Sequence, residues 1–296
     1  KKAYKKEQKK EKKEDSVKEN KAVKKIREEL AKGTSTEEVL KYHSNRIYVL
    51  NFFGNKEASQ VEQFREEISF LLQVAQPTDE VVVKLNSPGG VVQNYGLASS
   101  QIARLRQHEI KCTVCVDLVA ASGGYMMAAV ADKIVAAPFA IIGSIGVAAG
   151  LPNFHRILKK NEVDYFMFTA GKYKRTVTPL TEVTEEGQEK MQQDLESIHQ
   201  SFKKLIADHR KEIDIEEVAT GEFWLAEEAK EKGLVDEILT SDDYLFDKMK
   251  DFEIIEITTE DSRNRIEKLL QGGIELFQSF GRRTSLEDSE IPGLIR

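Results

Sequence analysis

Residues 80–90, which read EVVVKLNSPGG, join a short apolar run to a turn that contains two adjacent glycines. The run at 80–85 is rich in valine and typical of a buried strand, and the turn at 86–90 ends it. A similar apolar run lies at 46–53. Between the two runs we expect an amphipathic helix, whose apolar face is formed by Val61, Phe64, Ile68, Leu71, Leu72 and Ala75. This order of strand, helix and strand favours parallel pairing.

The same alternation continues along the chain. We expect helices over 95–106, 123–131 and 184–211, and strands over 110–117, 133–136 and 164–168. Residues 224–239 add a helix, a turn at Gly233 and a short strand. Strands that alternate with crossover helices predict an α/β fold in which helices pack on a parallel sheet.

Composition indicates a globular protein of 296 residues with 40% hydrophobic content. The net charge of −6 is unevenly spread, because the first fourteen residues contain eight lysines. The rest of the chain is acidic, so we expect no binding of nucleic acid. We divide the chain into a basic linker or coil at 1–44, a main domain at 45–240, and a C-terminal extension at 241–296. The extension contains an amphipathic stretch at 266–277.

The lysine-rich start raises the question of a membrane. Residue 1 is Lys rather than Met, so we expect the sequence to begin inside a longer product. Lysines beside a missing N-terminus often flank a transmembrane helix, although a solvated tail has the same composition. Residues 134–154 carry no charge, but Pro138 and several glycines argue against a spanning helix there.

Cys112 and Cys115 have the spacing of a redox pair or of half a zinc site. Their surroundings are those of a buried strand, where positions three apart point to opposite faces. No second Cys or His pair completes a zinc site, and no helix start supports a thiolate. We therefore expect two core residues.

Three glycine-marked turns, at 86–90, 121–125 and 142–146, each follow an expected strand, where open parallel sheets place their active sites. Ser122 stands between a strand and a helix, a position suited to a nucleophile and equally to a helix cap. Gly89 or Gly90, together with Gly123, can present backbone N–H groups as an oxyanion hole. An ordinary Pro-Gly turn is the alternative at 86–90.

A serine nucleophile needs a base. None of the five histidines lies in a glycine-marked turn or beside an orienting carboxylate. A lysine can serve when burial lowers its pKa, and the loop at 169–175 offers Lys172 and Lys174. Spacing alone does not choose between them, and such a basic loop is usually exposed to solvent.

Several of these segments together resemble the signal peptide peptidase A family, and in particular its SohB-type members. They are Ala-Ser-Gly-Gly-Tyr-Met-Met-Ala at 121–128, Asn-Ser-Pro-Gly-Gly at 86–90, Ile-Gly-Ser-Ile-Gly-Val at 142–147, Gly-Lys-Tyr-Lys-Arg at 171–175, Ala-Thr-Gly-Glu at 219–222 and Gly-Leu-Val-Asp at 233–236. The resemblance spans about residues 45–240 in the family's order. It implies a ClpP/crotonase-like fold, with Ser122 as nucleophile, Lys174 as base and Ser144 orienting that lysine.

The resemblance also implies a membrane-tethered homo-oligomer in the bacterial inner membrane that cleaves peptides such as signal-peptide remnants, with no metal or organic cofactor. The helix at 184–211 or the tail after Ser241 is the expected subunit contact, because each has an apolar face that one small domain does not bury. The family acts on the periplasmic side, whereas the lysines favour the cytoplasmic side. Two other function classes stay open: a crotonase-like acyl-coenzyme A enzyme, and a non-catalytic scaffold or chaperone-like partner of membrane proteases.

Overall fold

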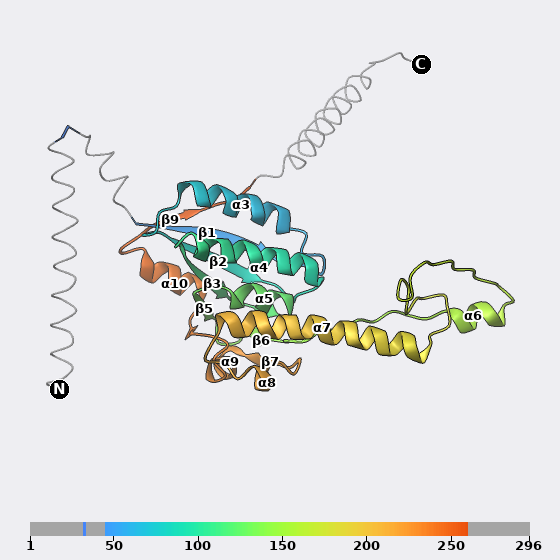
Figure 1. Cartoon of the computed structure of the whole chain (residues 1–296). Coiled ribbons are helices and arrows are strands. Elements are labelled where there is room, and N and C mark those ends of the chain that lie inside the picture. The colour runs from blue at the N-terminus through green and yellow to red at the C-terminus, as the bar shows by residue number, and fades with distance from the viewer. Residues whose placement is uncertain (1–31, 34–44, 260–296) are drawn as a thin grey trace, which may run out of the picture. The chain divides into compact units, whose positions relative to one another are not determined.

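Six strands form the main sheet of the computed structural model, which describes residues 32–33 and 45–259 (Figure 1). All neighbouring strands in this sheet pair in parallel. Across the sheet the order is β8 (Glu237–Ile238), β5 (Lys133–Ala136), β3 (Lys111–Val116), β2 (Glu80–Asn86), β1 (Arg46–Phe53) and β9 (Glu253–Glu256). The α/β prediction with a parallel sheet is confirmed.

Side chains alternate between the two faces of this sheet, as they do in any strand. In β2, Val81 and Val83 belong to the large core, while Val82 belongs to a smaller core on the other face. The helices that contribute to the large core include α3 (Val61–Val74), α4 (Val92–Gln107) and α5 (Gly123–Ala129). The smaller core packs against α10 (Ser241–Lys248).

The two cysteines fit this alternation. Cys112 lies in the large core and Cys115 in the smaller one, and both are buried and free. Burial raises the pKa of both thiols, that of Cys115 to about 12, so neither forms a thiolate near neutral pH. Their assignment as core residues is confirmed.

A second, smaller sheet was not predicted from the sequence. It consists of β4 (Val119–Ala121), β6 (Ile141–Gly143) and β7 (Phe223–Leu225), with β4 and β6 parallel and β6 and β7 antiparallel. Each strand has three residues, too few for a periodic pattern to show. The uncharged segment 134–154 is thereby divided between strands and turns, and no helix in the described part of the chain is long and apolar enough to span a bilayer.

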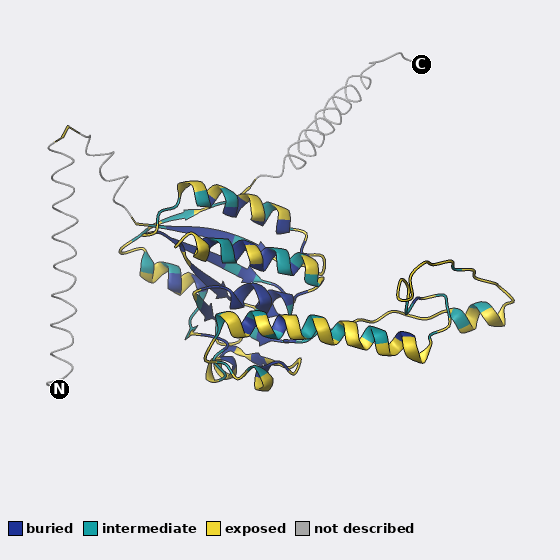
Figure 2. Cartoon of the chain, in the orientation of Figure 1, coloured by how far each residue is buried: buried dark blue, intermediate teal, exposed yellow. Residues whose placement is uncertain are grey.

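The long helix α7 (Glu185–His209) packs on the body only near its C-terminal end, where Phe202 and Ile206 are buried. Thr184 caps its start, because its hydroxyl oxygen accepts a hydrogen bond from the Gly187 N–H at 3.1 Å. The preceding residues 150–183, which we call the arm, include α6 (His155–Lys160) and are largely exposed (Figure 2). Two short helices, α8 (Ile215–Val218) and α9 (Ala226–Glu231), flank β7.

The prediction of a strand at 164–168 is wrong. This segment lies in the arm and pairs with no strand among the described residues, and Phe166 and Phe168 are 75% and 92% exposed. Its apolar content suggested a buried strand, but a strand exists only where a neighbour accepts its backbone hydrogen bonds.

The compact unit that contains the sheet extends to Ile257. Part of the expected C-terminal extension therefore belongs to it, since α10 covers one face and β9 pairs with β1. The amphipathic stretch at 266–277 and most of the basic segment 1–44 lie outside the described residues.

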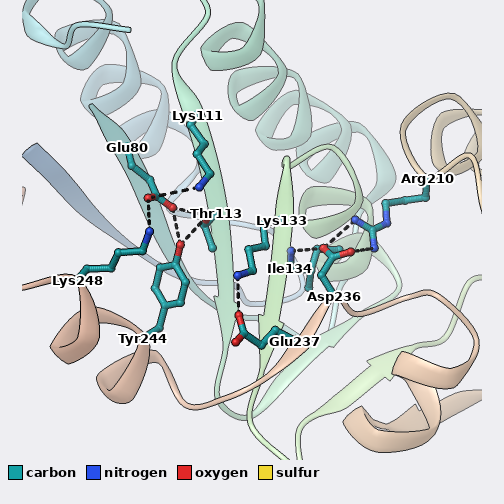
Figure 3. Close-up of polar contacts among 10 residues, drawn as sticks. All are labelled: Glu80, Lys111, Thr113, Lys133, Ile134, Arg210, Asp236, Glu237, Tyr244 and Lys248. Atoms are coloured by element: carbon teal, nitrogen blue, oxygen red, sulfur yellow. Dashed lines mark hydrogen bonds and ion pairs between the residues drawn. The ribbon is translucent and has the colours of Figure 1, made fainter. Parts of the chain in front are cut away.

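Glu80 is a charged side chain buried at the start of β2, and Figure 3 shows its contacts. Thr113 Oγ1 and Tyr244 Oη donate hydrogen bonds to its Oε1 at 2.5 and 2.6 Å. The ammonium groups of Lys248 and Lys111 lie 3.4 and 3.7 Å from its Oε2. Burial alone raises the pKa of Glu80, but the hydrogen bonds and the two lysines outweigh it, so this pKa lies below its ordinary value. The network joins α10 to β2 and β3.

Asp236, the last residue of the Gly-Leu-Val-Asp segment, joins three further elements (Figure 3). The Ile134 N–H donates to its Oδ2 at 2.6 Å, and Arg210 Nη2 donates to its Oδ1 at 2.7 Å. These bonds connect the β8 side of the sheet to β5 and to the end of α7.

Replacing Glu80 with Gln is expected to lower the free energy of unfolding by about 1–3 kcal/mol at neutral pH, because two lysines then lose a buried carboxylate. Since the pKa of Glu80 is lower in the folded protein than in the unfolded chain, its stabilising contribution is present above the ordinary glutamate pKa. It is lost as the pH falls through the folded value. Urea unfolding followed by circular dichroism measures the difference.

The stability difference between the wild type and Glu80→Gln should shrink on acidification. The control is Glu253→Gln, whose carboxylate pairs with Arg46 but is 58% exposed, so little change is expected at either pH. If the stability difference between the wild type and Glu80→Gln stays constant from neutral to acid pH, Glu80 is not charged in the folded protein.

Candidate functional site

Ser122 and Ser144 are neighbours because of how β4 pairs with β6. The two strands run parallel with Ala121 opposite Gly143, so each serine is the next residue after a paired position. The Ser122 N–H donates to the Gly143 carbonyl at 2.8 Å and continues the pairing beyond the strands. The turns at 121–125 and 142–146 are therefore in contact.

The turn at 86–90 lies on the other side of β4. Ser87 forms a parallel bridge with Ala120. Its N–H donates to the Val119 carbonyl at 2.8 Å, and its carbonyl accepts from the Ala121 N–H at 3.0 Å. All three glycine-marked turns are thus held side by side, as expected for turns that follow parallel strands.

Ser122 adopts an unusual backbone conformation, with φ +51° and ψ −119°. A residue with a Cβ rarely occupies this region, and such strain is concentrated at functional sites. Although Ser122 stands at the N-cap position of α5, its side chain makes no capping hydrogen bond. The helix-cap alternative for the hydroxyl is therefore excluded.

The glycines beside Ser122 differ in what their N–H groups do. The Gly89 N–H donates to Ser87 Oγ at 3.1 Å. Within the described residues, the N–H groups of Gly90 and Gly123 donate no hydrogen bond, and both glycines line the same cavity as Ser122. Two free backbone donors next to a serine make the arrangement that stabilises an oxyanion. Gly89 instead packs behind the turn, where an added Cβ would lie 2.7 Å from that of Ser122.

The cavity beside Ser122 has a volume of about 810 Å³ and also contains Ser144. One wall is a face of α7, because residues spaced three or four apart point the same way. The residues of α7 that line the cavity are Gln192, Leu195, Glu196, Ile198, His199 and Phe202. Several other lining side chains are apolar, including Val91, Val92, Met126 and Val147. Such a lining suits apolar side chains of a peptide.

His199 was missed by the sequence analysis. It lines the cavity, and its Nε2 lies 3.2 Å from the Ile145 carbonyl oxygen, beside Ser144. The signal was its place on the face of α7 shared with Leu195 and Phe202, which the search of glycine-marked turns did not use.

Lys172 and Lys174 do not line this cavity. Lys172 forms an ion pair with Glu186 in the first turn of α7 at 2.7 Å, and this contact raises its pKa. Lys174 is exposed, and its N–H donates to the Gly171 carbonyl at 3.1 Å. Glu186, the partner of Lys172, lies about 20 Å along α7 from His199 in the cavity wall, since a helix rises about 1.5 Å per residue. The structure thus brings Ser122, Ser144, Gly90 and Gly123 together, but not the basic loop.

Comparison with protein families decides the identity. A model described as "Peptidase family S49" matches residues 104–254, and one described as "Peptidase family S49 N-terminal" matches residues 1–102. The chain belongs to peptidase family S49. The first match contains Ser122, Ser144 and Lys174, and the second contains the turn with Gly89 and Gly90.

Relatives of this S49 peptidase agree with the match. A probable protease SohB of Haemophilus influenzae is 50% identical over 264 residues, which cover 89% of this chain and 70% of that protein. A probable protease SohB of Buchnera aphidicola subsp. Schlechtendalia chinensis is 51% identical over 212 residues, 70% of each chain. The predicted resemblance to SohB-type members is confirmed, and so is peptidase as the enzyme class.

The fold of this S49 peptidase is also found in a solved structure. A mutant of a membrane-bound stomatin-specific protease matches with a TM-score of 0.50 and 14% sequence identity, over 73% of this chain and 99% of that one. At this identity the match concerns the fold alone. Among residues 32–33 and 45–259 of the S49 peptidase, no group of three or more His, Cys, Asp or Glu side chains is arranged to hold a metal ion.

Gly90→Ala is expected to abolish most of the peptidase activity. An added Cβ would lie 2.0 Å from the Lys56 carbonyl oxygen, so residue 90 must move and carry its N–H away from the cavity. Gly96→Ala is the control, because nothing lies within 4 Å of its added Cβ and alanine favours the helix by about 0.5–1 kcal/mol. Peptide hydrolysis and thermal unfolding of both variants check this. Full activity of Gly90→Ala contradicts a role for this N–H.

Proposed function

We propose that this chain is a serine endopeptidase in which Ser122 attacks the peptide carbonyl. One observation carries the proposal: Ser122 is strained, its hydroxyl does not cap α5, and the free N–H groups of Gly90 and Gly123 line the same cavity. A strained serine beside two unused donors serves acyl transfer and has no evident structural purpose. The acyl-coenzyme A and scaffold alternatives have no use for a strained serine.

The proposed mechanism uses Lys174 as general base. Its neutral amine takes the Ser122 proton, and the alkoxide forms a bond to the carbonyl carbon. The N–H groups of Gly90 and Gly123 hold the oxyanion. Protonated Lys174 then gives its proton to the leaving amine. In the second half, Lys174 takes a proton from water while the water oxygen bonds to the acyl carbon. The bond between that carbon and Ser122 Oγ then breaks, and Lys174 returns the proton to the serine.

Lys174 is a better candidate than Lys172. The Glu186 carboxylate holds Lys172 in its charged form, which cannot accept a proton. No carboxylate lies against the ammonium of Lys174 in the described part of the chain. Ser144, next to Ser122, is proposed to accept or donate a hydrogen bond that orients the lysine at the site.

Since the loop at 171–175 is held near the start of α7, we propose that Lys174 reaches Ser122 of a second copy of the chain. The arm that carries it exposes Phe166 and Phe168, which need a covering surface. It also contains six Lys and Arg against three Asp and Glu. The arm is therefore an apolar, basic surface.

A complementary surface lies on the small sheet. Phe223 and Leu225 of β7 are exposed, and so are Leu118, which precedes β4, and Phe139, which lies just before β6, at 63% and 83%. The surrounding segment 214–231 contains seven Asp and Glu against a single Lys. Phe223 lies opposite Gly143, next to Ser144, so an arm bound here would bring its lysine to the site. Such a head-to-tail contact repeats from copy to copy and closes a ring when its rotation allows.

Membrane association and cleavage of signal-peptide remnants belong to the same proposal. They are supported by the lysine-rich segment at the start of the sequence and by the apolar lining of the cavity. Carbonate extraction of membranes from cells that produce the protein tests the association, and release of the protein into the soluble fraction would refute it.

A serine-directed fluorophosphonate is expected to add once to the chain, at Ser122. The phosphonyl group replaces the acyl group of the substrate, and the same base activates the hydroxyl. Intact-mass analysis should show a single adduct that is absent in Ser122→Ala. Ser99→Ala, a change of the same size at a buried serine in α4, should leave labelling intact. A wild type that is never labelled argues for the scaffold or acyl-coenzyme A alternative.

Mixing two inactive variants tests the shared site. Ser122→Ala and Lys174→Ala should each be inactive. Oligomers assembled from an equal mixture of the two should regain roughly a quarter of the wild-type rate, because one contact in four joins an intact serine to an intact lysine. Lys172→Ala should stay active. If the mixture stays inactive, Ser122 and Lys174 act within the same copy of the chain. If Lys174→Ala keeps its activity and His199→Gln loses it, His199 is the base.

A further inference from the structure

Behind the oxyanion donors lies a chain of hydrogen bonds whose direction is fixed by chemistry. Tyr95 Oη donates to the Asn55 carbonyl oxygen at 2.7 Å, because a carbonyl oxygen only accepts. Tyr95 has a single hydroxyl hydrogen, so in its 2.6 Å contact with Ser87 it is Ser87 Oγ that donates. The Ser87 oxygen is then free to accept from the Gly89 N–H at 3.1 Å.

This chain of hydrogen bonds decides which N–H group of the turn at 86–90 faces the cavity. Gly89 is buried with φ +87°, and its N–H is directed to Ser87 Oγ instead of the cavity. The following N–H, that of Gly90, is left for the oxyanion. A buried N–H without an acceptor is unfavourable, so removal of the Ser87 hydroxyl favours a rotated turn in which Gly89 finds another partner.

Tyr95 also supports the second donor. An added Cβ at Gly123 would lie 2.4 Å from Tyr95 Cγ, so the backbone that presents the Gly123 N–H rests directly on the tyrosine ring. The segment that Tyr95 holds through Asn55 continues to Lys56, whose carbonyl accepts from the Val91 N–H at 2.8 Å and packs against Gly90. One buried side chain on α4 therefore contacts the supports of both oxyanion donors.

Neither Tyr95 nor Ser87 lines the cavity, so neither touches a substrate there. Given the serine peptidase function proposed above, we propose that Tyr95 and Ser87 are positioning residues that set the Gly90 and Gly123 N–H groups at the spacing the oxyanion requires. Burial raises the pKa of Tyr95, which keeps its hydroxyl protonated and the direction of the chain of bonds unchanged near neutral pH.

Tyr95→Phe removes the hydroxyl and keeps the ring. We expect kcat for peptide hydrolysis to fall roughly 10- to 100-fold with KM nearly unchanged, because the donors act mainly on the transition state. A peptide aldehyde, which forms a tetrahedral adduct with Ser122, should bind more weakly by a similar factor. Ser87→Ala should show the same pattern.

Two matched variants separate positioning from general loss of stability. Tyr125→Phe removes an equally buried hydroxyl, which donates to the Leu234 carbonyl at 3.1 Å, and Ser99→Ala removes a buried hydroxyl that donates to Gly96 at 3.1 Å. Both should lose comparable thermal stability while kcat and aldehyde affinity stay at wild-type values.

The proposal is overturned if kcat and aldehyde affinity fall no further in Tyr95→Phe than in Tyr125→Phe, with the wild type active and Ser122→Ala inactive. If Tyr95→Phe does not fold, Ser87→Ala compared with Ser99→Ala decides by the same measurement. Failure of the proposed function is a different result, because the wild type itself would then neither hydrolyse peptides nor bind the aldehyde.

Discussion

Backbone hydrogen bonds on both sides of β4 hold the site together. This strand is three residues long, yet Ser87 pairs with it on one edge and β6 on the other. A shift of one residue in either pairing would separate Ser122 from Ser144 or from the turn at 86–90. The register is fixed because Ala120 and Ile142 are fully buried and Trp224 nearly so. The geometry of the site therefore depends on the packing of a sheet that is short in every strand.

Strain and stabilisation are placed at opposite ends of the main sheet. β2 begins at Glu80, where hydrogen bonds and two lysines surround a buried carboxylate, and it ends at the turn beside Ser122. Ser122 and Ser144 both have φ +51°, a conformation that persists only where surrounding contacts determine it. The arm is different, because it leaves apolar side chains exposed. A well-packed body and an exposed arm suit a site that is completed by assembly, as proposed for Lys174.

The sequence by itself determined most of the main sheet and the turn that carries Ser122. Strands β1 and β5 were predicted with the bounds that the structure has, because buried parallel strands are continuous apolar runs. Ser122 and the glycine pairs were found because turn chemistry is local, and the order of the motifs indicated the family. The opposite placement of Cys112 and Cys115 followed from the alternation of a strand.

Only the tertiary structure decided how these local pieces meet. The small sheet, the pairing of β9 and the absence of a strand at 164–168 depend on which segments find a hydrogen-bonding neighbour. The distinction between the N–H groups of Gly89 and Gly90 depends on Ser87 Oγ, and the entry of His199 into the cavity depends on the packing of α7. Sequence patterns report the conformation that a segment favours. The acceptor for each hydrogen-bond donor and the side chains that cover each apolar face come from residues distant in the chain.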